Sequence, residues 1–576
     1  MKKKKIFLIA GAALVLAACS NDEIVSPSGG GGSVNAGGTT TVVSDVPSVP
    51  VDNYVKAAVR VTSSATTPVS VYYETADEGR TPLVTNYLVA KGDNMIEFSA
   101  PSHVRSVVVA YTAGGAEAQQ MVALNAANYE YGQLAVYVDS KGEEQKDVWY
   151  YKYENGGLWH EHWRVYTEPQ VEYLDHICNQ ADCVAGENEK IVECNPQPVI
   201  PGDEEEEIVY GECDLGMDVT DYTGNLETAP GVNQGTTYHT AGVVMFDSYW
   251  PTSDIFDADF MYPHDMNDVV IDYDLESVVI DYKPGVNDEF FAQNDWKEGL
   301  TVTMHVRAVG SYYPQKVGLK LEGLSMDYVK THYEEIYLAA EDGEQFPVPN
   351  GSLSVNVTED GGCPVIWINN LQYLNSEAWR TSEYVNDDIK GMNVRYNTER
   401  KSKLYWLATG EDFVNRTGPL FTVKVKFEGE PRAALVGWGS EETLAQAEAQ
   451  VNAYKNAAAN PGAQNFFITT GNDDGNIYEI HVGGFAPLES YKADYSSIAN
   501  GNALLQNAEN AYYVSSNNGV WGVKAPMLVK HIYQGESFVD TYQELESFLK
   551  SWGEQNKNWY NTSEAKCDDT NLVKYW

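Results

Sequence analysis

The sequence is poor in positive charge. Its 576 residues include 38 Lys and Arg against 83 Asp and Glu, which gives a formal net charge of -45 at pH 7. A surface this acidic repels phosphate groups and anionic lipid headgroups. Nucleic acid and anionic membrane surfaces are therefore excluded as direct partners.

Long apolar runs are also scarce. The run from Ile6 to Ala18 follows four lysines and precedes Cys19, and it is too short for a transmembrane helix, which needs about 20 apolar residues. A basic segment, a short apolar run and small residues before a cysteine are typical of a bacterial lipoprotein signal. We predict a signal peptide over residues 1–18 and a lipid on Cys19 that anchors the protein to a membrane. The following Ser20–Glu23 is similar to the acidic tag that directs Bacteroidetes-type lipoproteins to the extracellular face of the outer membrane.

Cysteines are few, and six remain once Cys19 carries a lipid. An even number in an exported protein favours disulfides, although six cysteines allow 15 connectivities. The candidates are Cys178, Cys183, Cys194, Cys213, Cys363 and Cys567. We expect local pairing among the first four and a bond between Cys363 and Cys567. A metal site made of four cysteines is the alternative, but the tight C-x-x-C spacing typical of zinc is absent.

Common catalytic motifs are missing. The sequence has no G-x-S-x-G elbow, H-E-x-x-H helix, phosphate loop or dinucleotide fingerprint. A glycosidase needs two carboxylates about 5 to 10 Å apart. Among 83 acidic residues, the sequence does not distinguish such a pair. An enzyme is thus not indicated, and a surface hydrolase acting on host or dietary glycans remains an alternative.

The residues that are abundant indicate a mostly β fold. The chain has 39 Tyr, and many short runs of β-forming residues are separated by Gly, Asp, Asn or Pro. We predict an N-terminal immunoglobulin-like β-sandwich, followed by a larger antiparallel β-sandwich domain with two helical insertions, one after Ser440 and one from Asp540. The expected segments are a Gly/Ser/Thr-rich tether (19–50), the small sandwich (51–142), an aromatic and Cys-rich connecting segment (143–213) and the larger domain (214–576).

An acidic stretch from Phe246 to Asp274 is the strongest candidate site. No Lys or Arg occurs between Asp247 and Lys283, and crowded carboxylates must either face bulk water or hold a cation. Carboxylate and amide oxygens are the ligands of Ca²⁺, so we predict a structural Ca²⁺ site. Its candidate ligands are Asp254, Asp257, Asp259, Asp265, Asn267 and Asp268. The alternative is a set of solvated turn residues, since Asp and Asn favour turns for local reasons.

The strand that follows this turn is expected to separate the carboxylates further. In a strand over Val269–Leu275, alternate residues lie on opposite faces. Val269, Ile271, Tyr273 and Leu275 then share one face, and Asp268, Val270, Asp272 and Asp274 share the other. Asp272 and Asp274 are expected to mark the solvent face or a neighbouring site.

Several blocks of sequence occur in the order typical of a known family. They are WPTSD, DMNDVVIDYD, VRAVGSYY, YEIHVGGFAP, KAPMLVKHIYQGESFVDTYQELESFLKSW and NWY. Together they resemble the LruC-domain family of surface or exported lipoproteins of gut Bacteroidetes, over roughly Thr237 to Trp576. The family usually reads W-P-x-x-G-D-Y-D-x-N-D before the strand. Here the glycine is absent and about nine residues are inserted, so the first Asp of the motif corresponds to Asp254, Asp257 or Asp259.

The resemblance implies a fold and a location, but no activity. We therefore expect an outer-membrane surface lipoprotein with a Ca²⁺-stabilised β-domain that serves binding or adhesion, with a glycan or a surface protein as its ligand.

Overall fold

The computed structural model describes the folded part of the chain with gaps, and between residues 125 and 208 it describes the backbone alone. The described residues are 53–75, 79–126, 130–138, 144–154, 157–167, 170–178, 190–193, 208–221, 235–256, 264–280, 290, 296–309, 313–339, 345–348, 351–375, 421–431, 441–471, 475–505, 511–533, 535–551, 553, 555–562 and 565–572.

The described strands fall into two compact units, one within residues 125–210 and the other in residues 53–124 and 211–572. The first unit is an antiparallel sheet with the strand order β11-β10-β9-β8-β12. Its strands are β8 (Glu130–Val138), β9 (Glu144–Glu154), β10 (Gly157–Thr167), β11 (Gln170–Cys178) and β12 (Lys190–Glu193). The short β7 (Asn125–Ala126) precedes them in the chain.

The second unit begins with the strands expected for the small sandwich. β1 pairs antiparallel with β4, and β13 follows β1 in the same sheet. The strands are β1 (Tyr54–Ser63), β2 (Thr67–Thr75), β3 (Gly79–Val89), β4 (Gly92–Pro101), β5 (Ser106–Ala113), β6 (Ala116–Ala123) and β13 (Ile208–Asp214). Because β3 also pairs with β14, the sheet containing β2, β3, β5 and β6 continues into the larger domain. The chain passes between the two units after residues 124 and 210. The expected segment bounds at 142 and 213 stay a prediction.

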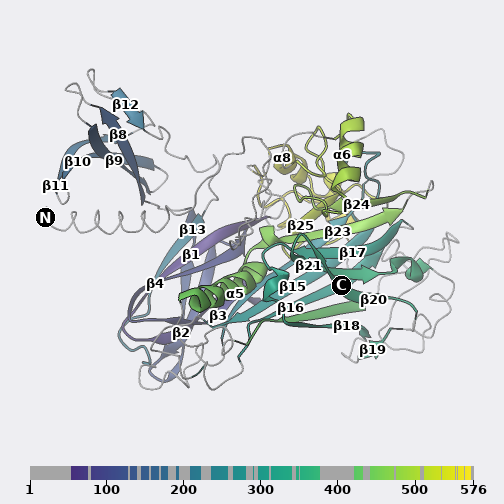
Figure 1. The fold of residues 1–576 in the computed structure, drawn as a ribbon, viewed down its shortest axis with the longest axis horizontal. Coiled ribbons are helices and arrows are strands. Elements are labelled where there is room, and N and C mark those ends of the chain that lie inside the picture. Colours follow the sequence, from purple (N-terminus) through teal and green to yellow (C-terminus); the bar gives the residue numbers. More distant parts are fainter. Residues whose placement is uncertain are drawn as a thin grey trace. The chain divides into compact units, whose positions relative to one another are not determined.

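The largest sheet has the order β19-β18-β22-β16-β15-β14-β3-β2-β5-β6, with β25 also pairing with β14 (Figure 1). Its remaining strands are β14 (Thr236–Phe246), β15 (Val269–Val279), β16 (Gly299–Val309), β18 (Thr331–Ala339), β19 (Gln345–Pro347), β22 (Phe421–Glu428) and β25 (Gly522–Ala525). Alternate residues of β16 are fully buried, as a sheet with one covered face requires.

A smaller antiparallel sheet has the order β20-β21-β17-β23-β24. Its strands are β17 (Pro314–Leu321), β20 (Ser354–Asp360), β21 (Cys363–Asn369), β23 (Gln464–Gly471) and β24 (Ile477–His481). The Tyr273 ring of β15 lies 4.7 Å, centroid to centroid, from the Phe466 ring of β23, so buried aromatic side chains join the two sheets. The predicted mostly β fold is confirmed.

Helices are few in the described residues and differ in part from the expectation. The first expected helix is α5 (Glu441–Ala459), which ends before Asn460 and contacts β14, β15 and β16. In place of the second expected helix there are two short helices, α7 (Phe538–Thr541) and α8 (Leu545–Lys550). The first of them begins before the expected Asp540, because Ser537 Oγ caps α7 by accepting from the Asp540 amide. A further helix is α6 (Lys492–Gly501). Short 3-10 turns are η1 (Met326–Tyr328), η2 (Leu371–Asn375), η4 (Pro461–Ala463) and η5 (Asp569–Asn571).

Candidate functional site

Two paired strands bring the ends of the acidic stretch together. The last residue of β14, Phe246, pairs with the first residue of β15, Val269. Asp247 and Asp268 therefore lie at the same end of the sheet, although 20 residues separate them in the sequence. The Ser248 amide donates to Asp268 Oδ2 at 2.7 Å, and the Ser248 hydroxyl donates to the same oxygen.

The turn from His264 to Asp268 is held by a segment near the C-terminus. Asp265 Oδ2 accepts from the Gly535 amide at 3.0 Å, and Asn267 Nδ2 donates to the Ile532 carbonyl at 3.1 Å. The Phe538 amide donates to the His264 carbonyl at 2.9 Å. These bonds place the acidic turn inside the protein.

We call Asp247, Asp254, His264, Asp265, Asn267 and Asp268 the acidic cluster. Its four carboxylates are each less than 5% exposed. His264 Nδ1 lies 2.8 Å from Asp247 Oδ2, which is the one ion pair that these residues make within the described part of the chain. One imidazole therefore interacts with the charges of three of these buried carboxylates, Asp247, Asp254 and Asp268.

Burial and mutual repulsion make this cluster hard to ionise fully. Burial, followed by the charge of Asp247, raises the pKa of Asp268 to about 7. Burial, with the charges of Asp268 and Asp247, also raises the pKa of Asp265 well above its ordinary value. For His264, burial lowers the pKa, but Asp247, Asp254 and Asp268 outweigh burial and the pKa rises. The cluster thus has a deficit of positive charge.

The donor atoms fit a hard cation only in part. Asn267 is 4% exposed, and its Oδ1 is buried without a hydrogen-bond partner. A carbonyl oxygen in that state is a suitable Ca²⁺ ligand. However, within the described ranges no three His, Cys, Asp or Glu side chains are grouped as metal ligands. A cation would therefore need Asn267 Oδ1 or backbone oxygens in addition to the carboxylates.

The structure places four of the six predicted ligands in the cluster. Asp265, Asn267 and Asp268 share the turn. Asp254 lies close enough to affect the pKa of His264, and its Oδ2 accepts from Asn517 Nδ2 at 3.4 Å. Asp257 and Asp259 lie outside the described residues.

Sequence reasoning missed Asp247 and His264 as members of the site. A signal for Asp247 was present, because the apolar run before it, Val243–Phe246, matches the run after Asp268 and the two pair in the sheet.

Over Val269–Leu275, one face of β15 is buried as expected, but the other is exposed only at Asp274, since Val270 and Asp272 are also buried. Val269, Ile271, Tyr273 and Leu275 are buried on one face, and Asp274 is exposed on the other. Asp272 was expected to mark the solvent face or a neighbouring site. It is 3% exposed because it forms an ion pair with Arg307 of the adjacent strand β16.

The described cysteines are free thiols. Cys213, Cys363 and Cys567 form no disulfide, so the expected Cys363–Cys567 bond is not formed. The two residues belong to different elements, since Cys363 Sγ faces the Glu322 carbonyl at 3.8 Å and Cys567 pairs with Tyr542. The side chain of Cys178 is not described, and Cys183, Cys194 and the lipidation candidate Cys19 lie outside the described residues.

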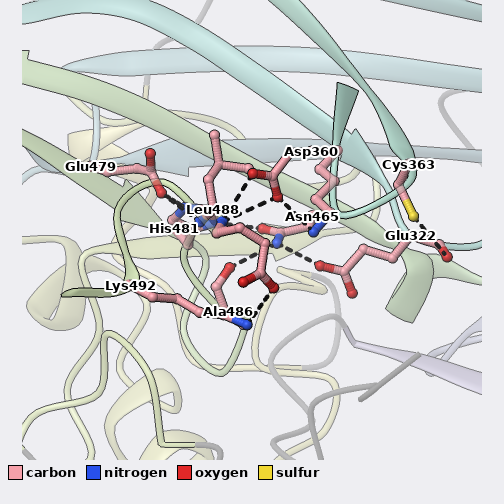
Figure 2. Close-up of polar contacts among 11 residues, drawn as sticks. Glu322, Asp360, Cys363, Asn465, Glu479, His481, Ala486, Leu488 and Lys492 are labelled. Atoms are coloured by element: carbon pink, nitrogen blue, oxygen red, sulfur yellow. Dashed lines mark hydrogen bonds and ion pairs between the residues drawn. The ribbon is translucent and has the colours of Figure 1, made fainter. Parts of the chain in front are cut away.

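A second buried polar network, which we call the His481 network, lies on the smaller sheet. Figure 2 shows His481 between Glu479 and Asn465, with Asn465 continuing the network to Glu322. His481 Nδ1 lies 2.6 Å from Asn465 Oδ1, and its Nε2 lies 2.7 Å from Glu479 Oε1. The imidazole is fully buried. It stacks between the rings of Phe467 and Tyr513 at 4.5 and 5.0 Å.

The His481 network also holds the segment that follows β24. Asn465 Nδ2 donates to the Ala486 carbonyl at 3.0 Å, and the Leu488 amide donates to Glu479 Oε1 at 2.8 Å. The Glu489 amide donates to Asp360, whose other bond is an ion pair with Lys320 at 3.0 Å. Of the two partners of the His481 ring, Glu479 comes from β24 itself and Asn465 from β23.

No helix in the described ranges has the length and apolar character needed to cross a membrane.

Comparisons with known proteins support the fold more than a function. Residues 298–560 match a protein family described as a domain of unknown function, DUF4842. The matched residues include the His481 network but not the acidic cluster. No curated protein matches the chain. Membership of the LruC-domain family stays a prediction.

The fold is similar to that of a candidate lipoprotein from Bacteroides ovatus. The TM-score is 0.54 at 21% identity, and the similarity covers 89% of this chain and 100% of that one. At this identity the similarity supports a shared fold. The fimbrial protein FimP from Actinomyces oris also matches, with a TM-score of 0.15, 7% identity and coverage of 76% of this chain and 69% of that one. Nothing is inferred from that match.

Proposed function

We propose that this protein is a lipid-anchored surface protein of the outer membrane, with binding or adhesion as its role and Ca²⁺ as a structural ion of its larger domain. The signal-like residues 1–18 and Cys19 support the anchor. The fold shared with a candidate lipoprotein of Bacteroides ovatus agrees with it. A glycan or a surface protein is the proposed ligand, bound on the extracellular side.

The observation that supports the proposed ion site is that the acidic cluster is buried and has too few positive charges to balance its carboxylates. Asp247, Asp254, Asp265 and Asp268 are nearly inaccessible to water, and His264 provides their one ion pair in the described part of the chain. Buried carboxylates without counter-charges become protonated or bind a cation. Ca²⁺ is favoured because all the proposed ligands are oxygen donors, which this hard ion prefers.

The proposed ligands are Asp265, Asn267 and Asp268 from the turn, together with Asp254. Asn267 contributes through Oδ1, the atom that lacks a hydrogen bond. Asp257 or Asp259 completes the set if the inserted residues fold back onto the turn. A bound ion would connect the turn to the C-terminal segment that Asp265 and Asn267 already contact, at Gly535 and Ile532.

The test is a Ca²⁺ titration of the full-length chain in detergent after chelation, with the thermal midpoint of unfolding as the measured quantity. An ion that binds only the folded state must raise this midpoint, even at the millimolar affinities of extracellular modules. In the double variant Asp265→Asn with Asp268→Asn, we expect no response to Ca²⁺ and a higher midpoint than the chelated wild type, since the repulsion is removed. Asp274→Asn is the matched control, because Asp274 is an exposed carboxylate of β15, the strand that follows the turn.

No shift of the wild-type midpoint at several millimolar Ca²⁺ would overturn the ion site. An equal shift in the double variant would place the ion elsewhere in the chain.

A further inference from the structure

The hydrogen atoms of the His481 network can be assigned from its donors and acceptors. Asn465 Nδ2 donates to Glu322 Oε1 at 2.9 Å and to the Ala486 carbonyl at 3.0 Å. Both amide hydrogens of Asn465 are thus used, and its Oδ1 can only accept. Because Oδ1 lies 2.6 Å from His481 Nδ1, the imidazole must carry a proton on Nδ1.

The other ring nitrogen faces a second acceptor. His481 Nε2 lies 2.7 Å from Glu479 Oε1, which already accepts from the Leu488 amide. A neutral imidazole with its proton on Nδ1 has a lone pair on Nε2, and an ionised carboxylate also only accepts. Two lone pairs at 2.7 Å repel each other. The contact therefore requires one additional proton, on the imidazole or on the carboxyl group.

We propose that this shared proton fastens residues 486–492 to the smaller sheet, and that the segment opens when the proton is lost. The segment depends on the pair directly, since Leu488 donates to Glu479 and Ala486 accepts from Asn465. Its next contacts are the Glu489 amide with Asp360 and the exposed Lys492–Glu489 ion pair. Exposed ion pairs contribute little to stability and cannot replace the buried contacts. The network is thus a proton-dependent latch.

The surroundings of the pair keep the proton isolated from water. The aromatic rings of Phe467 and Tyr513 cover the two faces of the imidazole. Burial is the largest influence on the pKa of His481 and lowers it overall, although Glu479 raises it; the charges of Lys320 and Asp360 act in opposite directions. The facing lone pairs of Nε2 and Oε1, 2.7 Å apart, nevertheless require the proton on the pair while the segment is closed.

The remaining titratable groups near the pair are Glu322, bonded to Asn465, and Tyr491, which interacts with Glu479.

The sign of the pH dependence follows from the number of bound protons. In the closed segment the pair holds the extra proton, while in the open segment His481 loses it near the ordinary pKa of about 6.5. Above that pH the closed state binds one proton more than the open state. The equilibrium constant for opening therefore rises about tenfold per pH unit, until the closed pair itself loses the proton.

Hydrogen–deuterium exchange of the full-length chain in detergent, from pH 6 to pH 9, tests the latch. Protection factors are taken for peptides that cover residues 486–492, after correction for the pH dependence of intrinsic exchange. Peptides from β23 are the internal reference. We expect protection of 486–492 to fall by about tenfold or more across this range, with β23 unchanged, because one proton is lost.

Glu479→Gln is the matched variant. Its side chain cannot carry the shared proton, and the one atom at the Oε1 position can serve either Nε2 or the Leu488 amide, but not both. We expect protection that no longer depends on pH. Wild-type protection that is constant or increases with pH would overturn the proposal, as would a Glu479→Gln variant with the wild-type slope. The wild-type profile decides the question by itself if the variant does not fold.

Discussion

Asp265 and Asp268 lie among other buried carboxylates; burial and the charge of Asp247 make both harder to ionise, and the charge of Asp268 adds to this effect at Asp265. The same residue type has a different role a few residues later. Asp272 is neutralised by Arg307, and Asp274 faces water. The chemistry of an aspartate in this stretch is thus decided by its partners in space rather than by its position in an acidic sequence.

His103 gives a prediction at the level of one side chain. Burial, with a smaller effect of the Arg105 charge, lowers its pKa to about 4. Between pH 6.5 and about 4 the unfolded chain therefore binds a proton that the folded chain does not. We expect the free energy of unfolding to fall as pH decreases through this window, by about 3 kcal/mol in total from this residue.

Urea unfolding at pH 7.5 and pH 4.5 measures this effect, with His103→Gln for comparison. The variant should lose less stability than the wild type between the two pH values. An identical loss in both proteins would show that His103 does not contribute.

At the level of elements, the N-terminal strands and the C-terminal residues form one folded unit. Trp559 Nε1 donates to Asn53 Oδ1 at 2.7 Å, and Tyr560 OH lies 2.9 Å from Ser102 Oγ. The His103 amide also donates to Tyr560 OH at 2.9 Å. The Asn-Trp-Tyr block singled out in the sequence is therefore an attachment point for the segment around β1 and β4.

Removal of one hydroxyl tests this attachment. In Tyr560→Phe the His103 amide and the Ser102 hydroxyl lose a buried partner, which costs about 1 to 3 kcal/mol. We expect a lower free energy of unfolding in chemical denaturation and faster amide exchange in β4. Tyr333→Phe is the control, because Tyr333 is 57% exposed. If both variants unfold like the wild type, Tyr560 is not a significant attachment.

At the level of the whole molecule, the predicted lipid on Cys19 would attach the protein to a membrane. We expect Cys19→Ser to remove metabolic fatty-acid labelling and to release the protein from the membrane fraction. Cys213→Ser is the control, because Cys213 is a buried free thiol. Digestion of intact cells with protease tests the orientation, since a protein on the extracellular face is accessible. Label retained in Cys19→Ser would contradict the predicted anchor.

Local sequence pattern alone was sufficient to predict several structural features. Val269, Ile271, Tyr273 and Leu275 lie on a buried face of β15, as the alternation indicated, and helix α5 follows Ser440 and ends before Asn460-Pro461-Gly462. These features depend on neighbours in the sequence, because the side-chain periodicity of a strand and the backbone limits of Pro and Gly act over a few residues.

Other features were decided only by the tertiary structure. The sequence showed the carboxylates of the turn, but the pairing of β14 with β15 added Asp247, and residues 532–538 buried the turn. The partners of His481 likewise come from β23, from β24 itself and from the segment after it. Burial and hydrogen bonding between distant segments set the ionisation of these groups, and no local pattern determines which segments meet.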